Sequence, residues 1–188
     1  MRVIAGKYRS RLLQSLPGLD IRPTADRLRE TLFNVLTAGN PDALEGTVWV
    51  DFYAGTGAVG IEALSRGAAK VHFVESSASA AELIRKNLRS LGIEVGFEIL
   101  RLDAVHALES LIAGGVIANV VFLDPPYRLE SEYGRLLAAL SQSRLVDAES
   151  LVIAEHQKKF DPGEEFVRFK RYRKLVQGDA ALGFYRMT

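Results

Sequence analysis

The alternation of two kinds of segment over residues 47–154 constrains the fold of this chain more than any other feature. Short apolar runs rich in β-branched and aromatic residues are typical of buried strands: Thr47–Phe52, Lys70–Val74, Gly96–Leu100, Val120–Leu123 and Ser150–Ala154. Stretches with apolar residues at helical spacing separate these runs: Val59–Ser65, Ala78–Leu91, Val105–Ile112 and Glu132–Leu140. Strands and helices that alternate predict an α/β fold, in which helices cover both faces of a parallel sheet.

The end of the chain departs from this alternation. Phe166–Val176 and Leu182–Met187 flank a short polar turn and predict a terminal antiparallel hairpin. Together with the central strands, this hairpin gives a seven-stranded, mostly parallel, Rossmann-like sheet. We expect that sheet to form one domain over residues 46–188.

The first 45 residues have a pattern of their own. Val3–Ile4 and Leu12–Leu13 predict a small hairpin, and Ala25–Leu36 predicts an amphipathic helix. Thr24 directly precedes that helix and is a suitable N-cap. We expect residues 1–45 to be an appendage of hairpin and helix on the α/β domain.

The charge of the chain is unevenly distributed, although its sum is only +1. Residues 1–30 and residues 156–175 each hold seven basic and three acidic side chains, whereas residues 31–155 hold nine basic and sixteen acidic ones. Basic ends around an acidic middle favour a polyanionic partner, although ends that are merely solvated would look the same. The chain has no cysteine, and no apolar run reaches the roughly 18 residues of a membrane helix. We expect a monomeric, cytoplasmic protein without membrane contact.

A glycine-rich turn follows the first central strand. Gly55, Gly57 and Gly60 match the pattern G-x-G-x-x-G, and Glu75 stands just after the next strand. Glycines let a backbone approach a ligand closely, and a carboxylate can accept hydrogen bonds from ribose hydroxyls. Because NAD and S-adenosylmethionine both contain an adenosine ribose, the turn predicts an adenosine cofactor without choosing between them.

The carboxylate of Asp51 favours S-adenosylmethionine. It would repel the two phosphates of a dinucleotide, but it would attract the ammonium and sulfonium groups of S-adenosylmethionine. After the third strand, Asp103 can accept from the adenine amino group while the Ala104 amide donates to the ring, although Asp103 could instead cap the following helix. The candidate cofactor contacts from these loops are Asp51, Tyr53, Ala54, Gly55, Gly57, Glu75, Asp103 and Ala104.

The fourth central strand ends in the tetrapeptide Asp124-Pro-Pro-Tyr127. An exocyclic amino group of a nucleobase is a poor nucleophile because its lone pair is delocalised into the ring. The Asp124 carboxylate and the Pro125 carbonyl could accept its two hydrogens and orient the nitrogen. Pro125 and Pro126 fix the loop and remove competing donors, while Tyr127 offers a face on which a flipped-out base can stack. These four residues are the candidate catalytic residues.

Four blocks of the sequence resemble the bacterial RsmD family: Ile4–Arg9, Ile21–Asn34, Glu62–Ala68 and Phe122–Tyr127. The resemblance implies a Rossmann-like class I S-adenosylmethionine-dependent methyltransferase that acts on N2 of a guanine in 16S ribosomal RNA. It also implies that the N-terminal block covers the cofactor and the base entrance. Arg22 and Thr24 then become candidate contacts to RNA or cofactor, with a rigid turn and helix cap as the alternative.

The expected partner is 16S ribosomal RNA or a small-subunit assembly particle. The candidate RNA-binding residues are Lys7, Arg9, Arg11, Arg22, Arg168, Lys170, Arg171 and Arg173. We expect Arg168 and Lys170 on one side of the terminal hairpin, and Arg171 and Arg173 on the other. The alternative function is an adenine-N6 DNA methyltransferase, which could use the same tetrapeptide. An NAD-dependent oxidoreductase and a non-catalytic RNA-binding protein are disfavoured by Asp51 and Asp124, and no metal site is expected.

Overall fold

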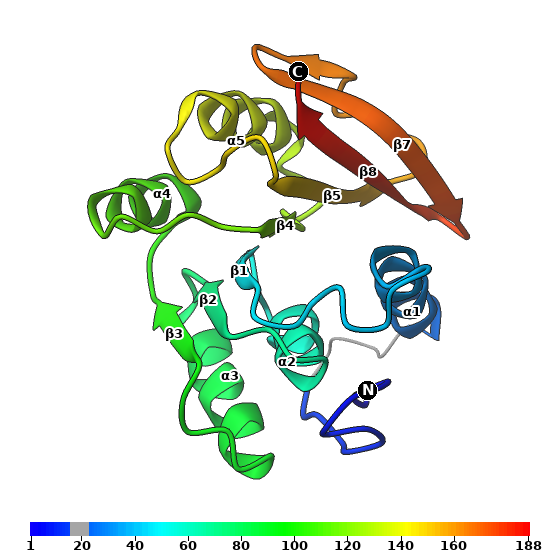
Figure 1. Cartoon of the computed structure of the whole chain (residues 1–188), viewed down its shortest axis with the longest axis vertical. Helices are drawn as coiled ribbons and strands as arrows, with labels where there is room; N and C mark the ends of the chain where they lie inside the picture. The colour runs from blue at the N-terminus through cyan, green and yellow to red at the C-terminus, as the bar shows by residue number, and fades with distance from the viewer. Residues whose placement is uncertain (16–22) are drawn as a thin grey trace.

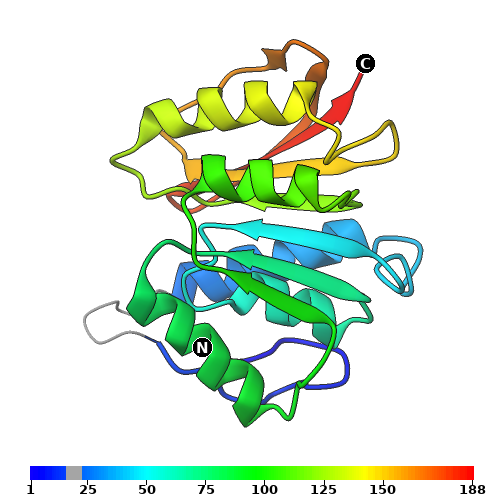
Figure 2. The same cartoon turned by 90° about the vertical axis from the view of Figure 1, so that its left-hand side faces the viewer.

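The computed structural model describes residues 1–15 and 23–188, with side chains described for residues 1–15 and 26–188. An eight-stranded sheet separates two layers of helices (Figure 1, Figure 2). The strands are β1 Val48–Phe52, β2 Lys70–Val74, β3 Phe97–Leu100, β4 Val120–Leu123, β5 Leu151–Gln157, β6 Glu165–Phe166, β7 Phe169–Gln177 and β8 Ala180–Met187. The helices are α1 Pro23–Leu36, α2 Ala58–Ser65, α3 Ala78–Ser90, α4 Ala104–Ala113 and α5 Glu130–Gln142. Within the described ranges, none of these helices has the length and apolar character needed to cross a membrane.

The strands lie in the order β3-β2-β1-β4-β5-β8-β7-β6. The first five in this order are parallel, and β8 runs antiparallel between β5 and β7. The order changes direction between β1 and β4, whose following helices, α2 and α5, lie on opposite faces (Figure 1). Such a switch point is where open α/β sheets bind their ligands, at the carboxyl ends of the strands.

The predicted α/β class is confirmed, but the sheet has eight strands where seven were expected. The additional strand β6 holds only two residues, and Phe166 pairs with Phe169 across a tight turn. Val167 in that turn adopts a positive φ of 48°. A strand of two residues is too short to produce an alternating pattern, so no signal for it is present in the sequence.

Each face of the sheet is buried by its own set of helices. On one face, α1, α2 and α3 cover Trp49, Phe73 and Phe122, and Phe33 of α1 stacks on Trp49 with 5.5 Å between ring centroids. On the other face, α4 and α5 cover a second buried cluster that includes Phe52 and Leu123. Burial on both faces explains why the parallel strands are continuously apolar in sequence.

The N-terminal segment forms a looser hairpin than expected. Its one β-bridge pairs Arg2 with Leu12, and the amide of Val3 donates to the carbonyl of Arg11 at 2.9 Å. The segment packs on α2, where the amide of Lys7 donates to the Ser65 carbonyl at 2.7 Å. Gly6 has a φ of +80°, and a Cβ there would stand 1.9 Å from the Ser65 carbonyl oxygen. A glycine is therefore required for the hairpin to lie this close to α2.

Two further expectations are wrong in detail. The helix α1 already includes Pro23, so Thr24 lies inside it and is not its N-cap; the side chain of Thr24 lies outside the described residues. In β7 a bulge between Arg171 and Arg173 shifts the pairing by one residue. Arg171 pairs with Tyr185 and Arg173 with Phe184, which face opposite sides of the sheet, so these two arginines do not share a side.

Candidate active site

Acidic residues stand at or just beyond the carboxyl ends of five adjacent strands. In the order of the sheet, from β3 to β5, they are Asp103, Glu75, Asp51, Asp124 and Glu155. Parallel strands lie about 4.8 Å apart, so these residues form a row along one edge of the sheet. This carboxyl edge is the candidate site.

The strand register places three of these side chains on the same face of the sheet, where they line one cavity. Asp51 pairs with Phe122 and Leu123 pairs with Ala154, so Asp51, Asp124 and Glu155 all project on the face covered by α1 and α2. The three side chains line a cavity of about 230 Å³. The other residues that line it are Met1, Leu28, Arg29, Leu32, Tyr53, Ala54, Gly55, Thr56, Ala58, Val59, Phe122 and Leu182.

Burial and mutual repulsion raise the pKa values of these carboxyl groups. Burial raises the pKa of Asp51 to about 7, with a smaller contribution from the negative charge of Asp124, and the Gly60 amide that donates to it at 3.0 Å opposes the shift. Burial likewise raises the pKa of Asp124 to about 7 and the pKa of Glu155 well above its usual range. Arg29, a basic residue that lines the same cavity, pairs with Asp26, so this cluster of carboxyl groups stays suited to a cationic ligand.

The glycine-rich turn is held against the end of β2. Its Gly55 amide donates to Glu75 Oε2 at 2.9 Å, and the Ser77 amide donates to Oε1 at 2.8 Å. Gly55 and Gly57 have φ values of 56° and 77°, which glycine adopts without strain. These contacts leave the Glu75 carboxylate fixed in place, with lone pairs that can still accept from a ligand.

Tyr53 and Asp103 have structural partners of their own. Tyr53 has a positive φ of 62°, and its hydroxyl donates to Glu132 at 3.0 Å, so it connects the first loop to α5. Asp103 is the N-cap of α4, where its carboxylate accepts from the amides of Val105 and His106 at 3.0 and 3.1 Å. The capping role that was the alternative for Asp103 is therefore present, and the buried Ala104 begins the helix.

The Asp124-Pro-Pro-Tyr127 loop is supported by Tyr133 of α5. The buried Tyr133 hydroxyl lies 2.7 Å from the Glu155 carbonyl oxygen and 3.4 Å from that of Pro125. The shorter contact takes the single hydroxyl proton, so the Pro125 carbonyl keeps acceptor capacity. Pro126 is exposed, and Tyr127 borders a small hollow beside Tyr133 and Phe160 rather than the carboxylate cavity.

The basic residues predicted to contact RNA are not gathered at the carboxyl edge. Arg11 donates to the carbonyl of Ser90 at 2.6 Å, and Lys7 lies beside Ser65; these are the last residues of α3 and α2. Both helices run antiparallel to the strands, so they end at the edge of the sheet where the parallel strands begin, which we call the amino edge. Lys7, Arg9 and Arg11 therefore lie toward the amino edge. Arg168 and Lys170 lie there too, at the start of β7. Arg22 lies outside the described residues.

Two arginines of the terminal hairpin are engaged within the protein. The side chain of Arg171 is only 6% exposed and pairs with Asp161 and Glu164, which makes it a poor phosphate contact. Arg173 lies over the Phe184 ring, 5.9 Å from its centroid.

Several residues at the carboxyl edge of the sheet were not predicted from the sequence. Glu155 follows the expected fifth strand directly, as Glu75 and Asp124 follow theirs, so the same signal could have identified it. Arg128, Lys158 and Lys159 are exposed and flank the ends of β4 and β5. Tyr133 and the buried Arg29 carried no signal, because an aromatic or basic residue inside a helix is ordinary.

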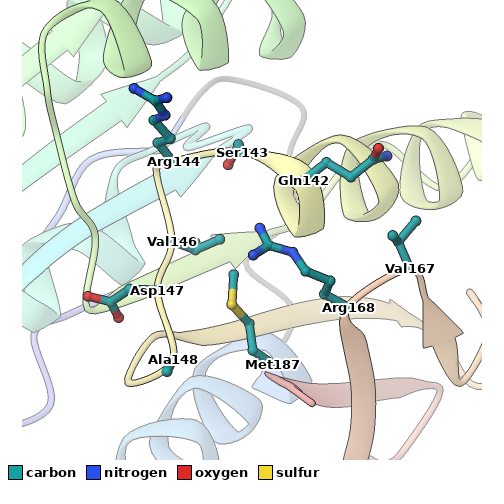
Figure 3. Close-up of a pocket in the computed structure, with 9 residues that line it drawn as sticks. All are labelled: Gln142, Ser143, Arg144, Val146, Asp147, Ala148, Val167, Arg168 and Met187. Atoms are coloured by element: carbon teal, nitrogen blue, oxygen red, sulfur yellow. The ribbon is translucent and has the colours of Figure 1, made fainter.

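A second hollow lies at the opposite, amino edge of the sheet (Figure 3). The loop after α5 and the ends of β7 and β8 form it, with Arg144 and Arg168 among its residues. It contains none of the residues predicted to act in catalysis or to hold a cofactor.

The fold and the row of carboxyl-edge loops define the class of the protein as an α/β methyltransferase of class I. Comparison with known proteins then gives the family: residues 1–186 match the family described as conserved hypothetical protein 95, and the chain belongs to it. This match confirms the resemblance to the RsmD family.

Individual relatives agree with this assignment over nearly the full chain. The chain is 32% identical to ribosomal RNA small subunit methyltransferase D of Escherichia coli, over 99% of this chain and 89% of the relative. It is 33% identical to the protein of the same name from Haemophilus influenzae, over 84% of this chain and 79% of the relative. A solved structure of a hypothetical protein from Thermus thermophilus superposes with a TM-score of 0.79 at 30% identity, covering 98% of both chains.

Proposed function

We propose that the protein transfers the methyl group of S-adenosylmethionine to the exocyclic N2 amino group of a guanine in 16S ribosomal RNA. The observation that carries the proposal is that Asp51 and Asp124 line one cavity, between the glycine-rich turn and the Asp124-Pro-Pro-Tyr127 loop. Relatives named ribosomal RNA small subunit methyltransferase D support the choice of RNA.

The cluster fits the charge of S-adenosylmethionine. Burial raises the pKa values of Asp51 and Asp124, and an ammonium or sulfonium group would favour their ionised forms. Glu75 lies at the end of β2, two strands from Asp124 at the end of β4. If the methyl group of the cofactor lies at β4, the ribose of the cofactor can lie beside Glu75. A dinucleotide would instead bring phosphates next to Asp51.

The bound cofactor supplies an electrophilic methyl group, and the chain supplies orientation and charge at the attacking nitrogen. The Asp124 carboxylate accepts one amino hydrogen and favours positive charge as it develops on that nitrogen. The Pro125 carbonyl accepts the other, because the Tyr133 hydroxyl donates to the Glu155 carbonyl and leaves the Pro125 oxygen available. The surplus proton leaves to Asp124 or to water after transfer, and the raised pKa of Asp124 suits that role.

Capture of RNA next to this cavity requires cations to offset its acidic edge. Arg128, Lys158 and Lys159 are exposed there, closer to the cavity than the predicted Lys7, Arg9 and Arg11. We propose the first set as the phosphate contacts nearest the target base, with the second set binding more distant phosphates. Such contacts position the RNA and leave the choice of base to the cavity.

The experiment that tests this function separates binding from chemistry. Asp124→Ala should lower transfer of tritiated methyl to small-subunit particles by about 100-fold or more while S-adenosylmethionine still binds in calorimetry. Glu149→Gln, an exposed carboxylate at the amino edge, is the matched control. Parental turnover by a folded Asp124→Ala protein would refute the amino-group mechanism.

The alternative function, adenine-N6 methylation of DNA, remains open to the same assay. Naked 16S RNA, small-subunit particles and duplex DNA are offered in parallel. A clear preference for DNA would favour the alternative.

A further inference from the structure

Glu155 is the acidic residue of the cavity to which the proposed reaction assigns no role. It lies at the carboxyl end of β5, immediately beside Asp124 in the strand register. Within residues 1–15 and 26–188, no donor is found for its carboxyl oxygens, whereas Asp51 accepts from the Gly60 amide. The Glu155 side chain is partly exposed and lines the cavity, so its carboxyl oxygens are open to a ligand there.

The order of the sheet places Glu155 on the substrate side of Asp124. The glycine-rich turn, Glu75 and Asp103 lie at β1, β2 and β3, on one side of β4. Glu155 lies at β5, on the other side. If the amino group reacts at Asp124, with the cofactor toward β1, then the ring to which the amino group is attached extends toward β5.

Guanine and adenine differ at the ring nitrogen beside the reactive amino group. In guanine the N2 amino group stands next to N1, which carries a hydrogen and donates. In adenine the N6 amino group also stands next to N1, but that nitrogen has no hydrogen and presents a lone pair. An ionised carboxylate placed next to Asp124 therefore matches guanine and repels adenine, and the positive charge of bound S-adenosylmethionine favours that ionised form of Glu155.

We infer that Glu155 is the base-recognition residue of this site and that its carboxyl oxygen accepts the N1–H of the target guanine. The inference rests on the proposed function and adds the contact that selects the base. Tyr133 supports it further, since its hydroxyl bonds the Glu155 carbonyl at 2.7 Å and fixes the end of β5 beside the catalytic loop.

The test replaces the target guanine of 16S RNA by 2-aminopurine, which keeps the amino group but has a bare N1. The parental protein should methylate guanine over 2-aminopurine by roughly 5- to 150-fold. In Glu155→Gln the carboxamide can donate to the bare N1, so the ratio should fall by about tenfold or more. Glu155→Ala adds no donor and should lower the ratio without reversing it. The different reactivity of the two bases cancels when the ratios of the variants are compared.

Two controls make the outcomes distinct. Glu149→Gln should leave the ratio unchanged, and calorimetry with S-adenosylmethionine should give Glu155→Gln an affinity comparable to that of the parent. An unchanged base ratio in Glu155→Gln, with or without weakened cofactor binding, would overturn the inference while N2-methylguanosine is still formed. Formation of N6-methyladenosine instead would contradict the proposed function, and the inference about Glu155 would fail because it rests on that function.

Discussion

The carboxylate of Glu62 accepts a hydrogen bond of 2.7 Å from the amide of Ile4. It also accepts from the Ala5 amide at 3.0 Å and from Arg66 Nε at 2.8 Å, and its side chain is fully buried. Glu62 and Ile4 belong to two of the four blocks that resemble the RsmD family. These blocks are therefore two halves of one contact, which holds the N-terminal segment on α2 and brings Met1 to the cavity.

Glu62→Gln should lower the free energy of unfolding by roughly 3 kcal/mol, because the amide replaces a buried acceptor with a donor that faces other donors. Urea unfolding measures the loss, and hydrogen exchange at the Ile4 and Ala5 amides should accelerate. Glu82→Gln, which removes an exposed pair with Arg85 at 3.5 Å, should cost less than about 1 kcal/mol. Equal losses in the two variants would deny Glu62 this role.

The buried carboxyl groups make stability depend on pH. Because burial raises the pKa of Asp51 and Asp124 from 3.8 to about 7, the folded protein binds protons more tightly than the unfolded chain between these values. The free energy of unfolding without cofactor should therefore fall as pH rises from about 4 to 7, by at most about 1.4 kcal/mol per pH unit for each group. Above pH 7 the stability that comes from proton binding to Asp51 and Asp124 in the folded protein is lost.

Asp51→Asn isolates the effect, since asparagine can still accept from the Gly60 amide. Urea unfolding between pH 5 and 8 should show a shallower fall for the variant. The comparison cancels the opposite slope from His72 and His156, whose pKa values burial lowers. Identical slopes would show that Asp51 is ionised throughout.

Tyr133 should act as a positioning residue for the catalytic loop. Tyr133→Phe removes the hydroxyl that lies near both the Pro125 and Glu155 carbonyls, and should cost about 0.5–1.5 kcal/mol of stability. The kcat of methyl transfer should fall while the KM for RNA stays unchanged, because the lost hydrogen bond fixes the end of β5 beside the catalytic loop and does not contact RNA. Tyr172→Phe, at a half-exposed tyrosine of β7, is the control. A change in KM alone would place Tyr133 in RNA binding.

The exposed cations should contribute unequally to RNA binding. Reversing Lys158 and Lys159 to Glu should raise the RNA concentration that half-saturates methyl transfer and reduce the salt slope of log affinity by up to about 0.9 per lost contact. Reversing Arg9 and Arg11 should have a smaller effect, because they lie toward the amino edge. Arg144→Glu, in the hollow of Figure 3, is the control for the single reversals Lys158→Glu and Lys159→Glu, which change the net charge by the same amount. A larger effect at Arg9 and Arg11 would move the main RNA surface to the N-terminal hairpin.

The central sheet was predictable from the sequence because its signals are local. β2 and β4 have the predicted bounds, since each is a short, mostly apolar run that stops at an acidic residue, Glu75 or Asp124. β6 was not predictable because two residues are too short for an alternating pattern, and the bulge at Tyr172 was not predictable because it depends on how β7 pairs with β8.

The candidate site was predictable only in part for the same reason. A carboxylate after a strand is visible in sequence, which identified Asp124 and Glu75. That Asp51, Asp124 and Glu155 share one cavity depends on register, and the positions of Arg9 and Arg171 depend on how the hairpins pack.

The identity of the methylated nucleoside tests the central claim most directly. Small-subunit particles are incubated with the protein and labelled S-adenosylmethionine, and the RNA is digested to nucleosides for mass spectrometry. We predict a single labelled product, N2-methylguanosine, which Asp124→Ala fails to form. Labelled N6-methyladenosine, or no labelled nucleoside from a protein that binds the cofactor, would contradict the proposed reaction.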